Sequence, residues 1–220
     1  MPVSALNEVM SSGEAYRPGN WEKHRDHDLY SAPYPYSPDY PQLARLERHH
    51  VFTDFGTSPT KGVISAIKWG YPKGGLPGGR WKMFSTAFRS GAFEAKIADL
   101  RQKPALSAVE IITALNSVQP GIKTATTSKL AYFAGLTARE GPCMIYDAMV
   151  RRAIRVRNDP EFTALRALMP VRDLTVHQQQ ETYGLYIQGL EAMARRCGTT
   201  PVQVEHFLFV VRQDGANEIP

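Results

Sequence analysis

The strongest constraint on the fold is the helical spacing of apolar residues. Ala108, Ile111, Ile112 and Leu115 lie at positions i, i+3, i+4 and i+7, the pattern of one helix face. Ser107 precedes them in a Ser-x-x-Glu capping box, which predicts that a helix begins there. We find neither a repeat nor a convincing two-residue alternation of the kind a strand would need. The sequence therefore predicts an all-α fold.

The same spacing and helix-end signals predict several further helices. Ser58 and Pro59 begin the first clear one, with proline near its first position. A second capping box, from Thr200 to Gln203, begins the last one. Gly198 is expected to end the long helix before it. The segments expected to be helical here are 80–101 (broken), 161–168, 176–196 and 202–212.

Length and composition are those of an ordinary globular protein. With 220 residues, 43% of them apolar and 21% charged, the chain can bury a substantial core, and we expect one domain over residues 1–220. No apolar run approaches the roughly 18 residues of a membrane span, and the N-terminus does not resemble a secretory signal. Two cysteines are too few for a four-Cys zinc or iron–sulfur site. We expect a cytoplasmic monomer without a metal or cofactor.

Residues 1–41 are rich in proline and tyrosine, which predicts an irregular arm rather than helices. Within it, His24, Asp26, His27 and Asp28 are residue types that bind metals. No third distant ligand pairs obviously with them, so a solvated charged turn is the preferred interpretation.

The helix that begins near Ser58 is expected to end in a run of glycines and aromatic residues. Trp69, Gly70 and Tyr71 open it, and further glycines continue to Gly79. Glycines beside large aromatic residues let the backbone approach a flat ligand. The alternative is a helix C-cap with two aromatic side chains in the core.

The chain is organised around residues 120–157. A Pro120-Gly121 turn leads into a short helical segment, residues 124–134, and Asp147 later begins a basic helix. The cations between Gly121 and Arg157 outnumber the acids, and this local excess of +5 equals that of the whole chain. They are Lys123, Lys129, Arg139, Arg151, Arg152, Arg155 and Arg157, against Glu140 and Asp147. One carboxylate in a basic region suits an enzyme that acts on a polyanion.

This stretch resembles the core motif of the helix-hairpin-helix DNA glycosylases, closest to the branch similar to 8-oxoguanine DNA glycosylase. Pro120-Gly121-Ile122 matches the opening of the hairpin, and Asp147-x-x-Val150-x-Arg152 matches the turn that carries the family's catalytic acid. The resemblance implies a helix-hairpin-helix and catalytic turn over residues 105–157, within a bundle of about eight to ten helices. The chain departs from the family pattern at two positions: Lys123 stands in place of the second hairpin glycine, and Ala125 stands in place of a catalytic lysine.

The resemblance implies a monofunctional glycosylase that flips a base out of double-stranded DNA and hydrolyses its N-glycosidic bond. Asp147 would be the catalytic carboxylate and water the nucleophile, with no strand cleavage. Lys129, 18 residues before Asp147, is a reserve candidate for a nucleophilic amine. Alternatively, Asp147 is only a helix N-cap, and the chain is a non-catalytic DNA-binding protein or a scaffold whose basic helix binds a protein.

The expected DNA contacts come from the hairpin and the two helices after it: Gly121, Lys123, Thr124, Lys129, Arg151 and Arg155. Arg152 is expected to support Asp147 or the fold instead. The expected base pocket contains Trp69, Tyr71, Cys143, Tyr146, Gln203 and Phe207. Core positions and a capping role are the alternatives for Phe207 and Gln203. The substrate would be an oxidised base, in repair, or a bulky modified base of phage DNA, in antiviral defence. Such an enzyme would associate with the nucleoid.

Overall fold

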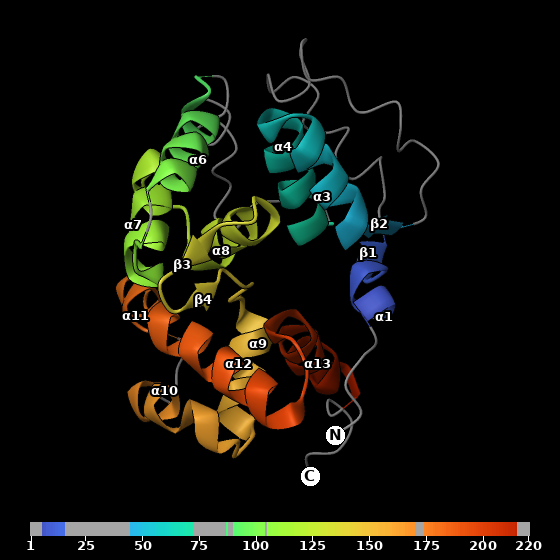
Figure 1. The fold of residues 1–220 in the computed structure, drawn as a ribbon, viewed down its shortest axis with the longest axis vertical. Helices are drawn as coiled ribbons and strands as arrows, with labels where there is room; N and C mark the ends of the chain where they lie inside the picture. Colours follow the sequence, from blue (N-terminus) through green and yellow to red (C-terminus); the bar gives the residue numbers. More distant parts are fainter. Residues whose placement is uncertain are drawn as a thin grey trace.

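The structure, a computed structural model, describes residues 6–15, 45–72, 87, 90–103, 105–169 and 174–214. These residues are mostly helical, which confirms the predicted all-α class (Figure 1). The helices are α1 (Leu6–Met10), α3 (Arg48–Thr57), α4 (Pro59–Gly70), α6 (Ala92–Gln102), α7 (Ala108–Val118), α8 (Thr124–Phe133), α9 (Ala148–Val156), α10 (Thr163–Leu168), α11 (Val176–Glu181), α12 (Tyr183–Cys197) and α13 (Pro201–Asp214), with a 3-10 turn η1 at Pro160–Phe162.

Two short antiparallel ladders accompany the helices. Strand β1 (Gly13–Ala15) pairs with β2 (Arg45–Glu47), and β3 (Thr137–Ala138) pairs with β4 (Gly141–Pro142). The sequence predicted no strands, and this was wrong. Strands of two or three residues are too short to show an alternating pattern. The predicted irregular arm lies mostly outside the described residues, as does the His24 to Asp28 cluster, while residues 6–15 form α1 and β1.

Several helix ends follow the predicted capping chemistry. Ser107 accepts the N–H of Glu110, whose carboxylate in turn accepts the N–H of Ser107, so α7 begins with a complete capping box. Gly198 ends α12 in the left-handed conformation, with φ at 62°. The long helix predicted over residues 176–196 is two helices, because the chain is interrupted at Thr182.

Helix α8 lies at the centre of the molecule, with α3 and α4 on one side, α6 and α7 on the other, and α9 to α13 below it (Figure 1). It packs against both α4 and α7, and its last five residues are all buried. Lys129 is therefore an interior lysine, although the sequence gives no sign of this. Residue Lys123 caps α8, so the predicted hairpin is the five-residue connection between α7 and α8.

Helix α3 was missed by the sequence analysis. Its residues, RHHVFTDFGT, mix polar and apolar side chains without a clear stripe, yet Val51 and Phe55 are buried one turn apart. Contact with α4, rather than its own periodicity, stabilises it. Among the described helices, none is both long and apolar enough to cross a membrane.

Candidate active site

Asp147 is the N-cap of α9. Its Oδ1 accepts the backbone N–H groups of Met149 and Val150, at 2.9 and 3.1 Å. The capping role that the sequence offered as an alternative is therefore real. It uses one carboxylate oxygen and leaves Oδ2 for another partner.

That partner is Lys129. Its Nζ lies 3.2 Å from Asp147 Oδ2 and 3.3 Å from the carbonyl oxygen of Ala125. The two side chains are only 7% and 15% exposed. An acid and an amine thus meet in a nearly buried position, across 18 residues of sequence. Sequence reasoning ranked Lys129 low because the hairpin register placed Ala125 at the family's lysine position.

The surroundings keep Asp147 ionised. Burial by itself would raise the pKa of this carboxyl group, but the charge of Lys129 and the two capping N–H groups outweigh it, so the pKa lies below its ordinary value. The N-terminal end of α9 favours the same charge. Asp147 is therefore a carboxylate over the whole neutral pH range.

Tyrosines of α12 fix the segment that leads to Asp147. The Tyr183 hydroxyl accepts the N–H of Met144 and donates to its carbonyl oxygen, at 3.0 and 2.8 Å. The Tyr186 hydroxyl donates to the carbonyl oxygen of Ile145 at 2.6 Å. All of these groups are buried. Side chains far along the chain thus replace a strand ladder and hold the backbone before Asp147 in one position.

The end of α4 lies directly against Lys129. A Cβ atom placed on Gly70 would lie 2.7 Å from Lys129 Cδ, so glycine gives the lysine its path to Asp147. The hydroxyl groups of Tyr71 and Thr126 are within hydrogen-bond distance of each other, which joins α4 to α8 beside the pair. Of the predicted glycine and aromatic run, residues 69–72 are described and border the candidate site, with Tyr71 as a half-buried wall. The rest of the run, to Gly79, lies outside the described residues.

The hairpin presents only some of the predicted contacts at the surface. Gly121 and Lys123 are exposed, and Gly121 has φ at 88°, which a side chain would disfavour. Thr124 is fully buried. Of the three hairpin residues predicted to contact phosphate, only Gly121 and Lys123 therefore lie at the surface.

The basic helix differs from the expectation. Arg151 is buried, donates to the carbonyl oxygen of Tyr146 at 2.9 Å and lies over its ring. Arg152 is exposed, although the sequence assigned it to the fold. Arg155 is half-buried. The helix rotation was misjudged by one position, so Arg151 supports the fold and Arg152 faces solvent.

The remaining predicted pocket residues take part in contacts of the fold. Tyr146 is fully buried and stacks on Tyr186, at 4.6 Å between ring centroids. Gln203 accepts the Thr200 N–H and caps α13. Phe207 packs under the guanidinium of Arg157, and Trp69 is buried.

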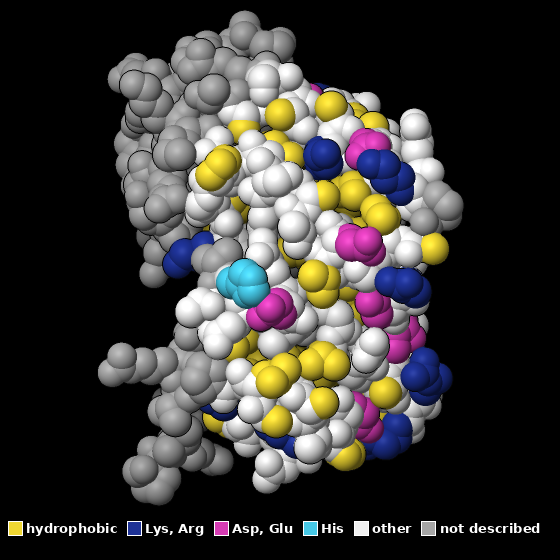
Figure 2. Space-filling view, turned by 90° about the vertical axis from the view of Figure 1, so that its left-hand side faces the viewer, with side chains coloured by type: hydrophobic (Ala, Val, Ile, Leu, Met, Phe, Trp, Pro, Cys, Tyr) yellow, Lys and Arg dark blue, Asp and Glu magenta, His cyan; other side chains and the backbone are white. Residues whose placement is uncertain are grey.

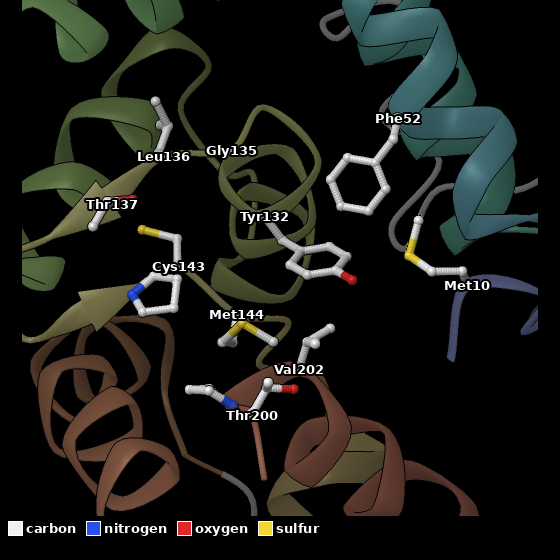
Figure 3. A pocket seen from close by; sticks show the side chains of 12 residues that line it. Met10, Phe52, Tyr132, Gly135, Leu136, Thr137, Cys143, Met144, Thr200 and Val202 are labelled. Carbon is white, nitrogen blue, oxygen red and sulfur yellow. The ribbon is translucent and has the colours of Figure 1, made fainter. Parts of the chain in front are cut away.

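An apolar cavity of about 440 Å³ lies beside these elements (Figure 3). Tyr132 points into it, between Phe52 of α3 and Met144 of the tyrosine-fixed segment. Of the residues predicted for the base pocket, Cys143 lines it, and burial raises the pKa of its thiol to about 12. The full lining is Met10, Phe52, Tyr132, Gly135, Leu136, Thr137, Pro142, Cys143, Met144, Thr200, Pro201 and Val202. Neither Lys129 nor Asp147 belongs to it.

One group of metal-binding residue types occurs within the described ranges. Glu47, His49 and His50 offer ligand atoms within 4.8 Å of one another. Two of them already form the capping box of α3, in which the Nδ1 atom of His50 accepts the N–H of Glu47. Helix capping accounts for this group without a metal.

Charged side chains of both signs share one face of the molecule (Figure 2). Figure 2 shows the face that carries α6 and α7, where Lys and Arg side chains alternate with Asp and Glu. On α6, for example, Asp99 forms ion pairs with both Lys96 and Lys103. Such a mixed face has little net attraction for a polyanion.

Comparison with known proteins gives one match. A family model described as "Putative 8-oxoguanine DNA glycosylase OGG-like protein" matches residues 7–209, nearly the whole chain. No curated protein and no solved structure matches this chain.

Proposed function

Because the chain belongs to the OGG-like family, we propose that it is a DNA glycosylase with Asp147 as its catalytic carboxylate. The observation that carries this is the nearly buried pair of Asp147 and Lys129, next to an exposed hairpin that bears Lys123. A base within a duplex is out of reach, so the nucleotide must rotate out of the stack to meet this carboxylate.

Asp147 would act on the sugar. When the N-glycosidic bond breaks, the base leaves with the bonding electrons and positive charge develops on the sugar. A carboxylate nearby stabilises that charge. Water then adds to C1′ of the sugar, and its proton passes to Asp147, which leaves an abasic site. The depressed pKa of Asp147 supports this role, because the group is charged before the substrate arrives.

Lys129 would hold Asp147 in place as an ammonium group, with water as the nucleophile. A second candidate follows from the 3.2 Å separation: the amine of Lys129 itself attacks C1′, forms a Schiff base and cuts the strand. Borohydride reduction distinguishes the two. A covalent adduct that is lost in Lys129→Gln supports the lyase, and no adduct supports the water mechanism.

The proposed DNA contacts are the exposed groups on this side of the fold. Gly121 and Lys123 would bind the strand through the hairpin, and Arg152 would add a phosphate contact from α9. Tyr71 would form a wall for the extruded base. Thr124 and Arg151 would contribute through the fold, since both are buried.

The substrate stays open between an oxidised base and a bulky modified base. Duplexes that carry each kind, glucosylated cytosine included, would be incubated with the protein, and abasic sites scored with and without alkali. If abasic sites form in only one kind of duplex, the modified base in that duplex is the substrate. A chain that binds DNA but releases no base would support the non-catalytic alternative.

Asp147→Asn tests the assignment of the carboxylate. It keeps the cap but removes the charge, so we expect loss of abasic-site formation with DNA binding retained. Asp159→Asn is a matched control, because Asp159 is also an N-cap acid paired with a cation, Arg157. Equal activity of Asp147→Asn and the wild type would reject the proposed role of Asp147.

A further inference from the structure

A second ion pair lies in the interior, and no part of the proposed mechanism uses it. Arg48, the first residue of α3, and Glu205 of α13 make two parallel hydrogen bonds, at 2.6 and 3.1 Å. Both side chains are fully buried. Burying two charges costs several kcal/mol for each, and apolar residues often replace such pairs without loss of stability. A role beyond stability is therefore worth seeking.

The pair contacts each element that carries the candidate site. Arg48 also donates to the hydroxyl of Tyr132, at 3.1 Å, and Tyr132 is one helical turn after Lys129 on α8. Its guanidinium lies over the ring of Trp69, 5.4 Å from the centroid, and Trp69 directly precedes Gly70. The guanidinium of Arg48 thus contacts α8, which carries Lys129, and α4, whose last residue Gly70 lies against that lysine.

Glu205 connects the same pair to Asp147. Helix α13 packs along α9, and Asp147 is the N-cap of α9. Burial raises the pKa of Glu205 despite the opposing charge of Arg48, and the charges of Asp147 and Lys129 both act on it. The helix that carries Glu205 thus packs against the helix that Asp147 caps.

The groups that face this part of the interior come from every packed element. They are Arg48 of α3, Lys129 and Tyr132 of α8, Asp147 at the start of α9, Tyr183 and Tyr186 of α12, and Glu205 and His206 of α13. The tyrosine pKa values are raised and that of His206 is lowered to about 4, so these three groups are neutral at neutral pH.

We propose that Arg48 and Glu205 form a positioning pair for the active site: they hold α8, which carries Lys129, against α13, which packs along the helix that Asp147 caps. This rests on the proposed glycosylase function for its kinetic consequence, but its positional part does not. Without the charge of Glu205, the Arg48 guanidinium loses its buried partner, and its hold on α8 and α13 weakens. The start of α9 at Asp147 should then shift relative to α8.

Glu205→Gln is the main test, since glutamine keeps the shape and loses the charge. The amide NMR signals of Met149 and Val150, whose N–H groups donate to Asp147, should shift relative to the wild type, because the start of α9 is displaced. Single-turnover excision should slow about tenfold or more, with little change in KM, because DNA contacts are untouched.

Glu161→Gln is the matched control. It removes the carboxylate partner of another arginine, Arg196, in a pair at the surface. Its excision rate and the amide signals of Met149 and Val150 should equal those of the wild type. A folded Glu205→Gln variant with wild-type amide signals and a wild-type rate would overturn the proposal.

If Glu205→Gln does not fold, Tyr132→Phe tests the positioning role of Arg48 instead. It keeps the ring and removes only the bond from Arg48 to α8, so we expect excision to slow several-fold. An unchanged rate would contradict the positioning role. If the wild type releases no base from any duplex, the glycosylase proposal fails instead, and the amide signals of Met149 and Val150 still test the positional coupling.

Discussion

Gly70→Ala should disable the site while leaving the fold intact. The new Cβ would lie 2.7 Å from Lys129 Cδ and 3.1 Å from Cε. Real Cβ atoms essentially never approach a carbon atom so closely, so the lysine side chain must move. Lys129 is only 7% exposed, which leaves few other directions for its chain, and the 3.2 Å contact with Asp147 should break.

Gly70→Ala should change the excision rate more than it changes the free energy of unfolding. Gly70 is the last residue of α4, where alanine gains up to about 1 kcal/mol over glycine from helix propensity. Loss of a charge-assisted hydrogen bond costs about 1.5–3 kcal/mol, so the unfolding free energy should fall by about 0.5–2 kcal/mol, out of the roughly 5–15 kcal/mol of a folded domain. Displacing a positioning group by about 1 Å can slow a reaction roughly 100-fold. We therefore expect excision to fall at least tenfold in a folded protein.

Single-turnover excision and urea unfolding of the same preparation measure both quantities. Gly56→Ala is the control, since a Cβ there meets no atom within 4 Å and Gly56 is also helical. It should keep its activity and gain a little stability. If Gly70→Ala excised the base at the wild-type rate, the contact between Lys129 and Asp147 would not matter for the reaction.

Four further predictions test the electrostatics and the fold. In Lys129→Gln, only the two capping N–H groups still oppose the effect of burial on Asp147, so its pKa rises and the acid limb of the pH–rate profile moves to higher pH. The wild type gains stability from Asp147 above its unfolded pKa of about 3.9, and this gain, measured against Asp147→Asn in urea, should vanish as the pH falls through the folded value. Arg152→Ala should weaken DNA binding and reduce its salt slope by about one, whereas Arg151→Ala should mainly destabilise the fold. Ser107→Ala should cost about 1 kcal/mol without affecting excision.

Local chemistry explains which parts of the fold the sequence predicts. The capping boxes at Ser107 and Thr200 and the terminal Gly198 depend on neighbours within a few residues, and all three end or begin helices as expected. Helix α3 and the short ladders depend on contacts with distant segments, which no local pattern records. The family resemblance, seen in the hairpin and the Asp147 turn, is confirmed by the family match.

The site is predictable only where the motif names its residues. The motif singles out Asp147, but the partner Lys129 becomes visible only when α8 and α9 pack together. For Arg151 and Arg152, the spacing along the helix did not predict correctly which side chain faces the core. An error of one position turns a side chain by about 100°, which here exchanges surface and core. Arg48 and Glu205, 157 positions apart, carry no local signal.

The capping role of Asp147 and its proposed catalytic role are compatible in one arrangement. Capping fixes Oδ1 against the N–H groups of Met149 and Val150, and this fixes the direction of Oδ2. Lys129 then meets an oxygen whose position the backbone has already set. The helix end also stabilises the negative charge that the proposed reaction needs. The cap therefore orients the carboxylate, and asparagine is the informative replacement because it separates the charge from the cap.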